Sequence, residues 1–242
     1  MGSRRPSTAS AQHLRPVRLR RRYTDYAEGS VLIEMGRTRV LCNASVEDQV
    51  PDFLRGSGQG WVTAEYAMLP RSTLTRRVRE SRRGRPDGRS LEISRLIGRA
   101  LRAAVALDQL PPVSIVIDCD VLQADGGTRC AAVTGGMVAL VDALRWLRQH
   151  RSLETLPLRE LVAAVSVGLV DGMATLDLCY DEDVRAAVDM NVVMTASGRF
   201  VEIQGTAETE PFTQRQLGAL KNLAARGIED LVARQKKTLR MK

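Results

Sequence analysis

The residues best suited to chemistry lie in one short stretch, residues 118–129, which reads DCDVLQADGGTR. Its first part is rich in β-forming residues, and its two consecutive glycines allow a sharp turn. The run that follows, residues 131–147, has the pattern of a helix despite two internal glycines. Thr128 and Arg129 therefore stand at a helix start, where free backbone N–H groups and the positive end of the helix dipole meet. We predict an anion site there, with phosphate as the expected anion.

The glycine turn has a plainer alternative, since many glycine turns before helices serve packing alone. This one lacks the Lys-Ser/Thr ending of a P-loop and the spacing of a dinucleotide fingerprint. The motif by itself therefore leaves both interpretations open.

A second chemical feature is a cluster of five carboxylates within thirteen residues: Asp177, Asp181, Glu182, Asp183 and Asp189. Such hard oxygen ligands suit Mg²⁺ or Mn²⁺, which take one or two carboxylates together with substrate phosphate oxygens. A solvated acidic loop is the alternative. Asp189 is followed at once by an apolar run, residues 190–194, so we expect it at a strand end. Asp118 and Asp120, on one face of a predicted strand, are the reserve candidates for a metal.

The third feature is an arginine-rich segment, residues 71–89, which carries eight arginines against Glu80 and Asp87, a net charge of +6. It lacks apolar periodicity and contains turn-forming glycine and proline, so a long loop is predicted. So much like charge in one loop favours contact with a polyanion. For the basic stretches at residues 1–22 and 234–242, two interpretations are equally good: contact with nucleic acid, or an aid to solubility.

Composition argues against several function classes. The chain has 242 residues, 44% of them hydrophobic, which is enough for one domain with a large core or for two small ones. No apolar run reaches the roughly 20 residues of a membrane helix, and the basic N-terminus lacks an apolar signal segment, so we expect a cytoplasmic protein without membrane contact. The four cysteines form no CxxC pair and are expected to be reduced and buried. Two histidines in polar surroundings argue against a zinc site or a histidine-based nucleophile.

Hydrophobic periodicity predicts the elements that must position these groups. Three hairpins are expected, at residues 30–35 with 38–46, 161–169 with 173–178, and 191–195 with 200–204. Further strands are expected at residues 61–66 and 114–122, and further helices at 91–107 and 213–236, the last with a capping box at Thr213 and Gln216. Local hairpins favour mixed sheets over a purely parallel one, which indicates an α+β fold.

Nine segments of the chain carry motifs that, taken together, point to one known family. They are LRPV (14–17), AEGSVLI (27–33), GQGWVTAEY (58–66), MLPRST (68–73), GRSLEISRLIGRALR (88–102), DCDVLQADGGTR (118–129), VAAVSVG (162–168), DMNVVMT (189–195) and EIQGTAE (202–208). The chain thus resembles ribonuclease PH, a bacterial family of phosphate-dependent exoribonucleases that trim the 3′ end of tRNA precursors. The motifs run from near one end of the chain to near the other.

The resemblance implies a fold and an assembly. The fold would be the α+β ribonuclease PH fold, with duplicated β-α units and mixed sheets similar to domain 2 of ribosomal protein S5. It would form a single domain over residues 13–242, with residues 1–12 as a basic arm outside it. The assembly would be a homohexameric ring, built as a trimer of dimers.

The resemblance also implies roles for individual residues. Phosphate would be bound by Arg89, Gly127, Thr128 and Arg129, and a metal by Asp183 and Asp189. Catalysis would depend on Arg89, Arg129, Asp183 and Asp189, and loop arginines Arg71, Arg76 and Arg79 would grip tRNA. Leu74, Val78 and Cys130 depart from the family pattern, but no charged functional position is lost.

The implied activity is phosphorolysis of RNA from its 3′ end, with Mg²⁺ or Mn²⁺ as cofactor and inorganic phosphate as co-substrate. The products would be nucleoside 5′-diphosphates, the reaction would be reversible, and the substrates would be tRNA precursors and other structured RNA such as rRNA. One alternative is a catalytically silent ring subunit of an RNA-degrading assembly, against which the retained arginines and aspartates argue. A broader polynucleotide phosphorylase role is the other, and 242 residues show no appended RNA-binding domain.

Overall fold

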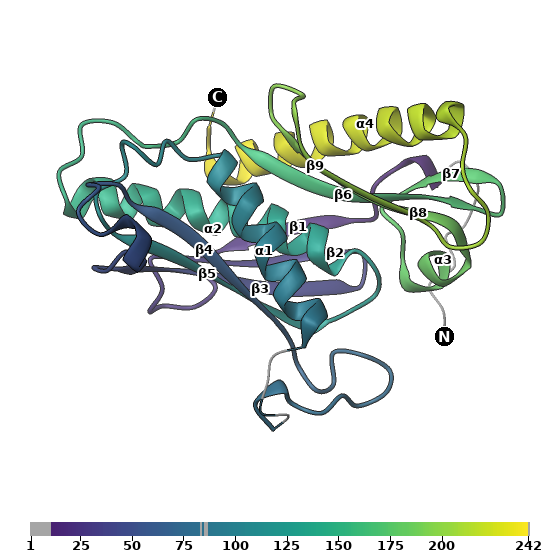
Figure 1. Ribbon diagram of the computed structural model, residues 1–242, viewed down its shortest axis with the longest axis horizontal. Helices are drawn as coiled ribbons and strands as arrows, with labels where there is room; N and C mark the ends of the chain where they lie inside the picture. Colours follow the sequence, from purple (N-terminus) through teal and green to yellow (C-terminus); the bar gives the residue numbers. More distant parts are fainter. Residues whose placement is uncertain (1–10, 83, 85–86, 242) are drawn as a thin grey trace.

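Two β-sheets pack around one long helix in the described chain, residues 11–82, 84 and 87–241, shown as a computed structural model in Figure 1. The first sheet has five strands in the order β1-β2-β3-β5-β4, with β4 and β5 parallel and the other pairs antiparallel. Its strands are β1 (Val17–Arg21), β2 (Gly29–Met35), β3 (Thr38–Glu47), β4 (Trp61–Met68) and β5 (Ser114–Gln123). The sheet is mixed, as the sequence predicts.

The second sheet has four strands in the order β7-β6-β8-β9, and all of its pairs are antiparallel. Its strands are β6 (Val162–Val170), β7 (Met173–Leu176), β8 (Ala186–Thr195) and β9 (Phe200–Ala207). The helices are α1 (Gly88–Ala103), α2 (Thr128–His150), α3 (Tyr180–Arg185) and α4 (Gln214–Leu239), and short 3₁₀ turns cover Asp52–Leu54 and Glu80–Arg82. A capping box of Thr213 and Gln216 opens α4, as predicted.

Helix α2 lies between the two sheets and contacts β2 and β3 of the first and β6 of the second. A Cβ at Gly135 would lie only 2.7 Å from Ile33 Cγ2, so this internal glycine permits the close approach of helix and sheet. By length and composition alone α2 could cross a membrane, but 83% of its most apolar window is buried inside the protein. We therefore interpret α2 as the core helix.

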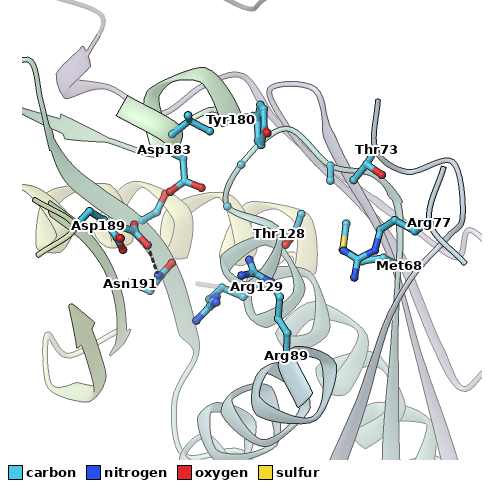
Figure 2. Close-up of a pocket in the computed structure, with 16 residues that line it drawn as sticks. Met68, Thr73, Arg77, Arg89, Thr128, Arg129, Tyr180, Asp183, Asp189 and Asn191 are labelled. Atoms are coloured by element: carbon cyan, nitrogen blue, oxygen red, sulfur yellow. Dashed lines mark hydrogen bonds between the residues drawn. The ribbon is translucent and has the colours of Figure 1, made fainter. Parts of the chain in front are cut away.

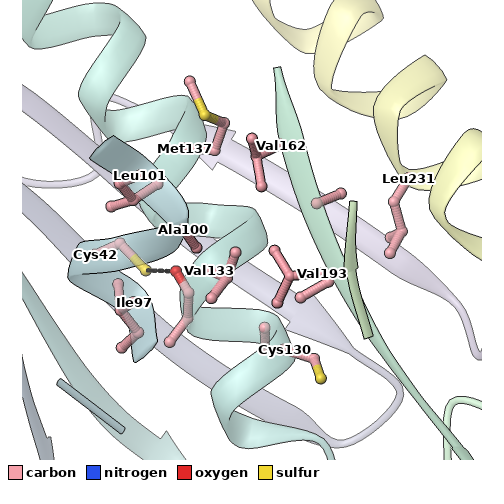
Figure 3. Packing of buried hydrophobic residues seen from close by; sticks show 14 of the residues in the cluster. Cys42, Ile97, Ala100, Leu101, Cys130, Val133, Met137, Val162, Val193 and Leu231 are labelled. Carbon is pink, nitrogen blue, oxygen red and sulfur yellow. Dashed lines mark hydrogen bonds between the residues drawn. The ribbon is translucent and has the colours of Figure 1, made fainter. Parts of the chain in front are cut away.

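The buried apolar side chains of both halves form one large cluster. Alternate residues of the strands face α2, among them Cys42 on β3 and Val162 on β6, and Figure 3 shows α2 side chains such as Val133 and Met137 packed among them. Helix α4 covers β6, β7 and β8, and α1 packs on β4. All four cysteines are free and buried, as expected from their apolar surroundings.

Several elements differ from the sequence prediction, and helix α1 ends at Ala103 rather than residue 107. Strand β1 lies inside the basic N-terminal stretch, where it pairs with β2 along its whole length. Strand β7 ends at Leu176 rather than residue 178, because Asp177 takes a left-handed φ of 53°. The acidic segment, for which a solvated loop was the alternative interpretation, contains the short helix α3. Strand β8 begins five residues earlier than predicted, at Ala186 rather than Asn191.

Candidate active site

The predicted glycine turn joins β5 to α2, and both of its glycines have left-handed backbones. Gly126 has φ 75° and Gly127, the N-cap of α2, has φ 64°. A Cβ at Gly126 would lie 2.3 Å from the carbonyl oxygen of Leu178, so only glycine fits. Helix α2 then begins at Thr128, which confirms the predicted helix start. The first backbone N–H groups of this helix have no partner within the helix and are suited to an anion.

A buried ion pair holds the turn in place from behind. The backbone N–H of Arg15 donates to Asp177 Oδ2 at 3.0 Å, its Nε to the same oxygen at 2.9 Å, and its Nη2 to Oδ1 at 2.6 Å. Nη1 also donates to the carbonyl of Asp125 at 2.5 Å. Burial lowers the pKa of Arg15, but the charge and hydrogen bonds of Asp177 outweigh it and raise that pKa above its ordinary value.

Asp177 is therefore not a metal ligand, although the sequence groups it with the acidic cluster. Its side chain is fully buried and bound by Arg15, which comes from a position 162 residues earlier in the chain. Asp118 and Asp120, the reserve candidates, line a different cavity beside α1 together with Glu65. Burial raises the pKa of both carboxyls there.

A cavity of about 560 Å³ opens in front of the glycine turn. Arg89 from α1 and Thr128 and Arg129 from α2 line it, and so do Asp183 from α3 and Asp189 from β8. Figure 2 shows the guanidinium groups and the carboxylates arranged around the same space. The structure therefore brings the predicted phosphate-binding and metal-binding residues together in one site.

Arg129 and Thr128 are held in place by neighbours outside the cavity. Arg129 Nη1 donates to Gln204 Oε1 at 2.8 Å and lies 3.5 Å from a carboxylate oxygen of Glu92. Thr128 Oγ1 and the Tyr66 hydroxyl share a hydrogen bond of 2.8 Å, and burial raises the pKa of Tyr66, which keeps that hydroxyl protonated. Both groups are thus fixed before any ligand binds, which favours oriented binding.

Asp189 lies within β8, where it is the fourth residue of the strand and pairs with Gly168 and Thr206. The prediction that Asp189 stands at a strand end is therefore wrong. Strand β8 begins at Ala186, four residues before the apolar run 190–194 on which the prediction was based. Burial, and then the charge of Asp183, raise the pKa of Asp189 to about 6. Burial also raises the pKa of Asp183, although Arg89 and Arg129 act in the opposite direction.

Asn191 and Cys130 form a polar link behind Asp189 that the sequence did not reveal. The Cys130 thiol donates to Asn191 Oδ1 at 3.2 Å, and burial raises the pKa of this thiol, which keeps it a donor. Asn191 Nδ2 then faces Asp189 Oδ2 at 3.5 Å. The alternation of β8 places residues 189 and 191 on one face, and this was the available signal. Cys130, a departure from the family pattern, thus fixes which end of the Asn191 amide faces the site.

The two carboxylates fit a divalent metal of the magnesium type. No group of three or more His, Cys, Asp or Glu side chains forms a metal cluster within residues 11–82, 84 and 87–241. Mg²⁺ commonly takes only one or two protein carboxylates and fills its remaining positions with water and substrate phosphate. Burial, and then the nearby charge of Asp183, raise the pKa of Asp189, and a bound cation would relieve both effects.

The loop arginines do not behave as one group. Arg77, which the sequence did not single out, lines the cavity and donates to Asp87 Oδ2 at 3.1 Å. Arg76 and Arg79 are exposed and line none of the cavities described in this section, and Arg71 lines a neighbouring cavity. Arg83 and Arg85, which contribute to the predicted +6, fall outside the described residues. Tyr180 and Glu208 also line the site without having been predicted.

Comparison with known families decides the classification. Residues 13–145 match domain 1 of the 3′ exoribonuclease family of ribonuclease PH type, and residues 160–227 match domain 2 of the same family. The chain belongs to the ribonuclease PH family. The resemblance noted from the nine motifs is confirmed. The family divides residues that we expected to form a single domain into two parts, and α2 belongs mostly to the first while it packs against both sheets.

Solved structures show the same fold at low sequence identity. Rrp46 from rice (Oryza sativa) aligns with a TM-score of 0.76 and 17% identity over 95% of this chain and 97% of that chain. A chain of the Archaeoglobus fulgidus exosome with RNA bound to the active site aligns with a TM-score of 0.76 and 20% identity, over 92% and 89%. A chain of an archaeal exosome core aligns with a TM-score of 0.72 and 19% identity, over 93% and 88%. The ribonuclease PH fold predicted from the motifs is therefore confirmed.

Proposed function

We propose that this protein is a phosphorolytic exoribonuclease that trims the 3′ ends of tRNA precursors and other structured RNA, rRNA included. The observation that carries the proposal is the single cavity lined by Arg89, Thr128 and Arg129 together with Asp183 and Asp189. A cationic cradle beside paired carboxylates suits the attack of one phosphate on another. Family membership supports a 3′ exoribonuclease in general.

The arginines would bind and orient inorganic phosphate. Arg89 and Arg129 present guanidinium groups, each of which can bind two phosphate oxygens at once, and Gln204 holds Arg129 in place. The start of α2 adds backbone N–H donors. One phosphate oxygen then attacks the phosphorus that joins the last nucleotide to the preceding one. A phosphorus–oxygen–phosphorus link forms, the bond to the 3′-oxygen of the preceding nucleotide breaks, and that oxygen takes up a proton. A nucleoside 5′-diphosphate leaves, and excess diphosphate drives the reverse addition.

Asp183 and Asp189 would hold Mg²⁺ or Mn²⁺, which when bound supplies positive charge to the scissile phosphate. The position of Asp183 on the exposed side of the cavity leaves it within reach of solvent. Asp189 is the more buried of the two, and Asn191 faces its Oδ2. Changing either aspartate to asparagine should reduce the rate by orders of magnitude.

We further propose a cytoplasmic homohexamer built as a trimer of dimers. Four free, buried cysteines suit a reducing compartment. The outer strand β9 carries Phe200 and Ile203, which are 48% and 42% exposed. Closed assemblies commonly cover such edges.

One assay tests the activity directly. An RNA with an unpaired 3′ end should lose nucleotides only when inorganic phosphate is present, and the product should be nucleoside diphosphate. Release of monophosphate in phosphate-free buffer would mean that water is the nucleophile. If RNA binds without any turnover, the chain is instead the silent ring subunit, against which the complete set of arginines and aspartates argues.

A further inference from the structure

The motif EIQGTAE, residues 202–208, contributes only Glu208 to the lining of the phosphate cavity, the cavity of about 560 Å³ at the start of α2. Most of the motif belongs to β9, the outer strand of the second sheet. Glu202 and Gln204 lie two positions apart and therefore on the same face of this strand. Neither side chain lines the cavity, so any effect they have on it passes through another residue.

The Gln204 amide makes three hydrogen bonds that use both of its ends. Its Oε1 accepts from Arg129 Nη1 at 2.8 Å. Its Nε2 donates to Glu92 Oε1 and to Glu202 Oε1, each at 3.0 Å. A guanidinium only donates and a carboxylate only accepts, so these neighbours fix which end of the amide faces Arg129.

The neighbours of Gln204 are themselves anchored. Arg99 of α1 donates from Nε to Glu202 Oε2 at 3.0 Å and from Nη2 to Glu202 Oε1 at 2.8 Å. Glu92, also on α1, has a carboxylate oxygen 3.5 Å from Arg129 Nη1. A continuous set of polar contacts therefore runs from α1 through β9 to Arg129 on α2, and it joins parts of both halves of the fold.

A second amide lies directly beside Gln204 and faces the opposite charge. Asn191 of β8 is the cross-strand partner of Gln204, so their side chains are neighbours on one face of the sheet. Asn191 Nδ2 faces Asp189 Oδ2 at 3.5 Å, whereas Gln204 presents its carbonyl oxygen to Arg129. Within the described chain Arg129 forms its ion pair with Glu92 and none with Asp189. Neutral amides thus contact the cation and the anion without cancelling the charge of either.

We propose that Gln204 is a positioning residue for the phosphate site, whose neutral carbonyl oxygen holds the Arg129 guanidinium apart from Asp189 and leaves its positive charge available to phosphate. A carboxylate at position 204 would also hold Arg129, but it would compensate the charge that attracts the anion. Gln204 itself touches no phosphate and acts only through Arg129. The proposal rests on the proposed function, since it takes phosphate to be the ligand of Arg129.

Calorimetric titration of the full chain with inorganic phosphate, without RNA, tests this role. Gln204→Ala should raise the Kd for phosphate about tenfold, the scale of one hydrogen bond to a charged group. Gln204→Glu should raise the Kd at least as much, although it keeps the size of the side chain and an acceptor for Arg129. Gln109→Ala is the control, because Gln109 is exposed and lines none of the cavities described above. Wild-type affinity in both Gln204 variants would overturn the proposal.

A double variant separates charge compensation from a role in packing alone. Glu92→Gln added to Gln204→Glu restores one amide and one carboxylate beside Arg129, with the amide now on α1. The Kd should return toward the wild-type value, and this recovery should exceed the effect of Glu92→Gln by itself. Equal effects of Glu92→Gln in the two backgrounds would overturn the coupling between Glu92 and Gln204. Circular dichroism of each variant checks the fold.

Phosphorolysis measured on the same samples separates this proposal from the proposed function. In Gln204→Ala the KM for phosphate should rise more than kcat falls, because the change weakens phosphate binding. Wild-type turnover together with an unchanged phosphate Kd in Gln204→Ala rejects only the role of Gln204. Weakened phosphate binding in Gln204→Ala without any wild-type turnover rejects only the proposed activity.

Discussion

Arg15 and Asp177 form a buried ion pair with three hydrogen bonds between residues 162 positions apart. Arg15 stands just before β1, and Asp177 stands just after β7 of the second sheet. Arg15 also holds the carbonyl of Asp125. The pair therefore joins the two halves of the fold directly behind the phosphate turn.

Asp177→Ala should destabilise the protein and loosen the phosphate turn. It leaves the Arg15 charge buried without its partner, which typically costs about 3–5 kcal/mol of unfolding free energy. Denaturant unfolding measures that loss, and the KM for phosphate should rise in variants that still fold. Arg20→Ala is the control, since the exposed Arg20 forms a long 3.5 Å pair with Glu34 that should contribute about 1 kcal/mol or less. Equal losses in the two variants would contradict a special role for the pair.

Arg129→Ala should abolish turnover while leaving the fold intact. The change removes both a charge and an oriented donor from the phosphate site. Steady-state phosphorolysis measures the loss, and circular dichroism checks the fold. Arg148→Ala, near the other end of the same helix, should retain normal activity. Substantial activity in Arg129→Ala would remove Arg129 from the site.

Asp189→Asn should stabilise the metal-free protein at neutral pH. The folded pKa of Asp189 is about 6, above its ordinary value of 3.8, mainly because of burial. The folded state therefore holds this proton more tightly than the unfolded chain, and the associated stability is lost as pH rises from about 4 through about 6. At pH 7 the variant should exceed the wild type by on the order of 2–3 kcal/mol.

Thermal unfolding in a chelator at pH 4 and pH 7 measures this effect. The gain should be present at pH 7 and should shrink to a small fraction near pH 4, where the folded carboxyl is protonated and the unfolded carboxyl is close to its ordinary pKa of 3.8. A gain of the same size at both pH values would show that the aspartate charge is not its cause.

Arg76 and Arg79 should act on structured RNA and not on the reacting end. Both are exposed and line none of the cavities described above. Changing both to Ala should weaken binding of a tRNA precursor and reduce its salt dependence by about 0.7–0.9 in slope per lost phosphate contact. Phosphorolysis of a short single-stranded RNA should change little. Arg77→Ala is the contrasting variant, because Arg77 lines the phosphate cavity and its loss should affect both substrates.

The protein should be a closed oligomer, with the hexamer as the expected state. Light scattering on the purified protein measures its mass directly. A monomer of 26.6 kDa at working concentration would contradict the expectation. Repeating the mass measurement at low and at moderate ionic strength shows whether the assembly depends on surface charge.

The sequence by itself determined the features that depend only on neighbouring residues, namely turns, helix starts and helix caps. The double glycine before an apolar run marked the turn and the start of α2, because left-handed backbone and helical periodicity are properties of neighbouring residues. The hairpin turns and the capping box of α4 followed for the same reason. The nine motifs were sufficient to place the chain in its family.

Only the tertiary structure decided which of the candidate groups face one another. Asp177 pairs with Arg15 instead of joining the other carboxylates, Asp189 lies within a strand, and Arg77, which the sequence did not single out, lines the cavity. These outcomes depend on strand register and on contacts between residues more than a hundred positions apart, which local periodicity does not encode. The raised pKa of Asp189 arises in the same way, from burial that exists only after both sheets have packed on α2.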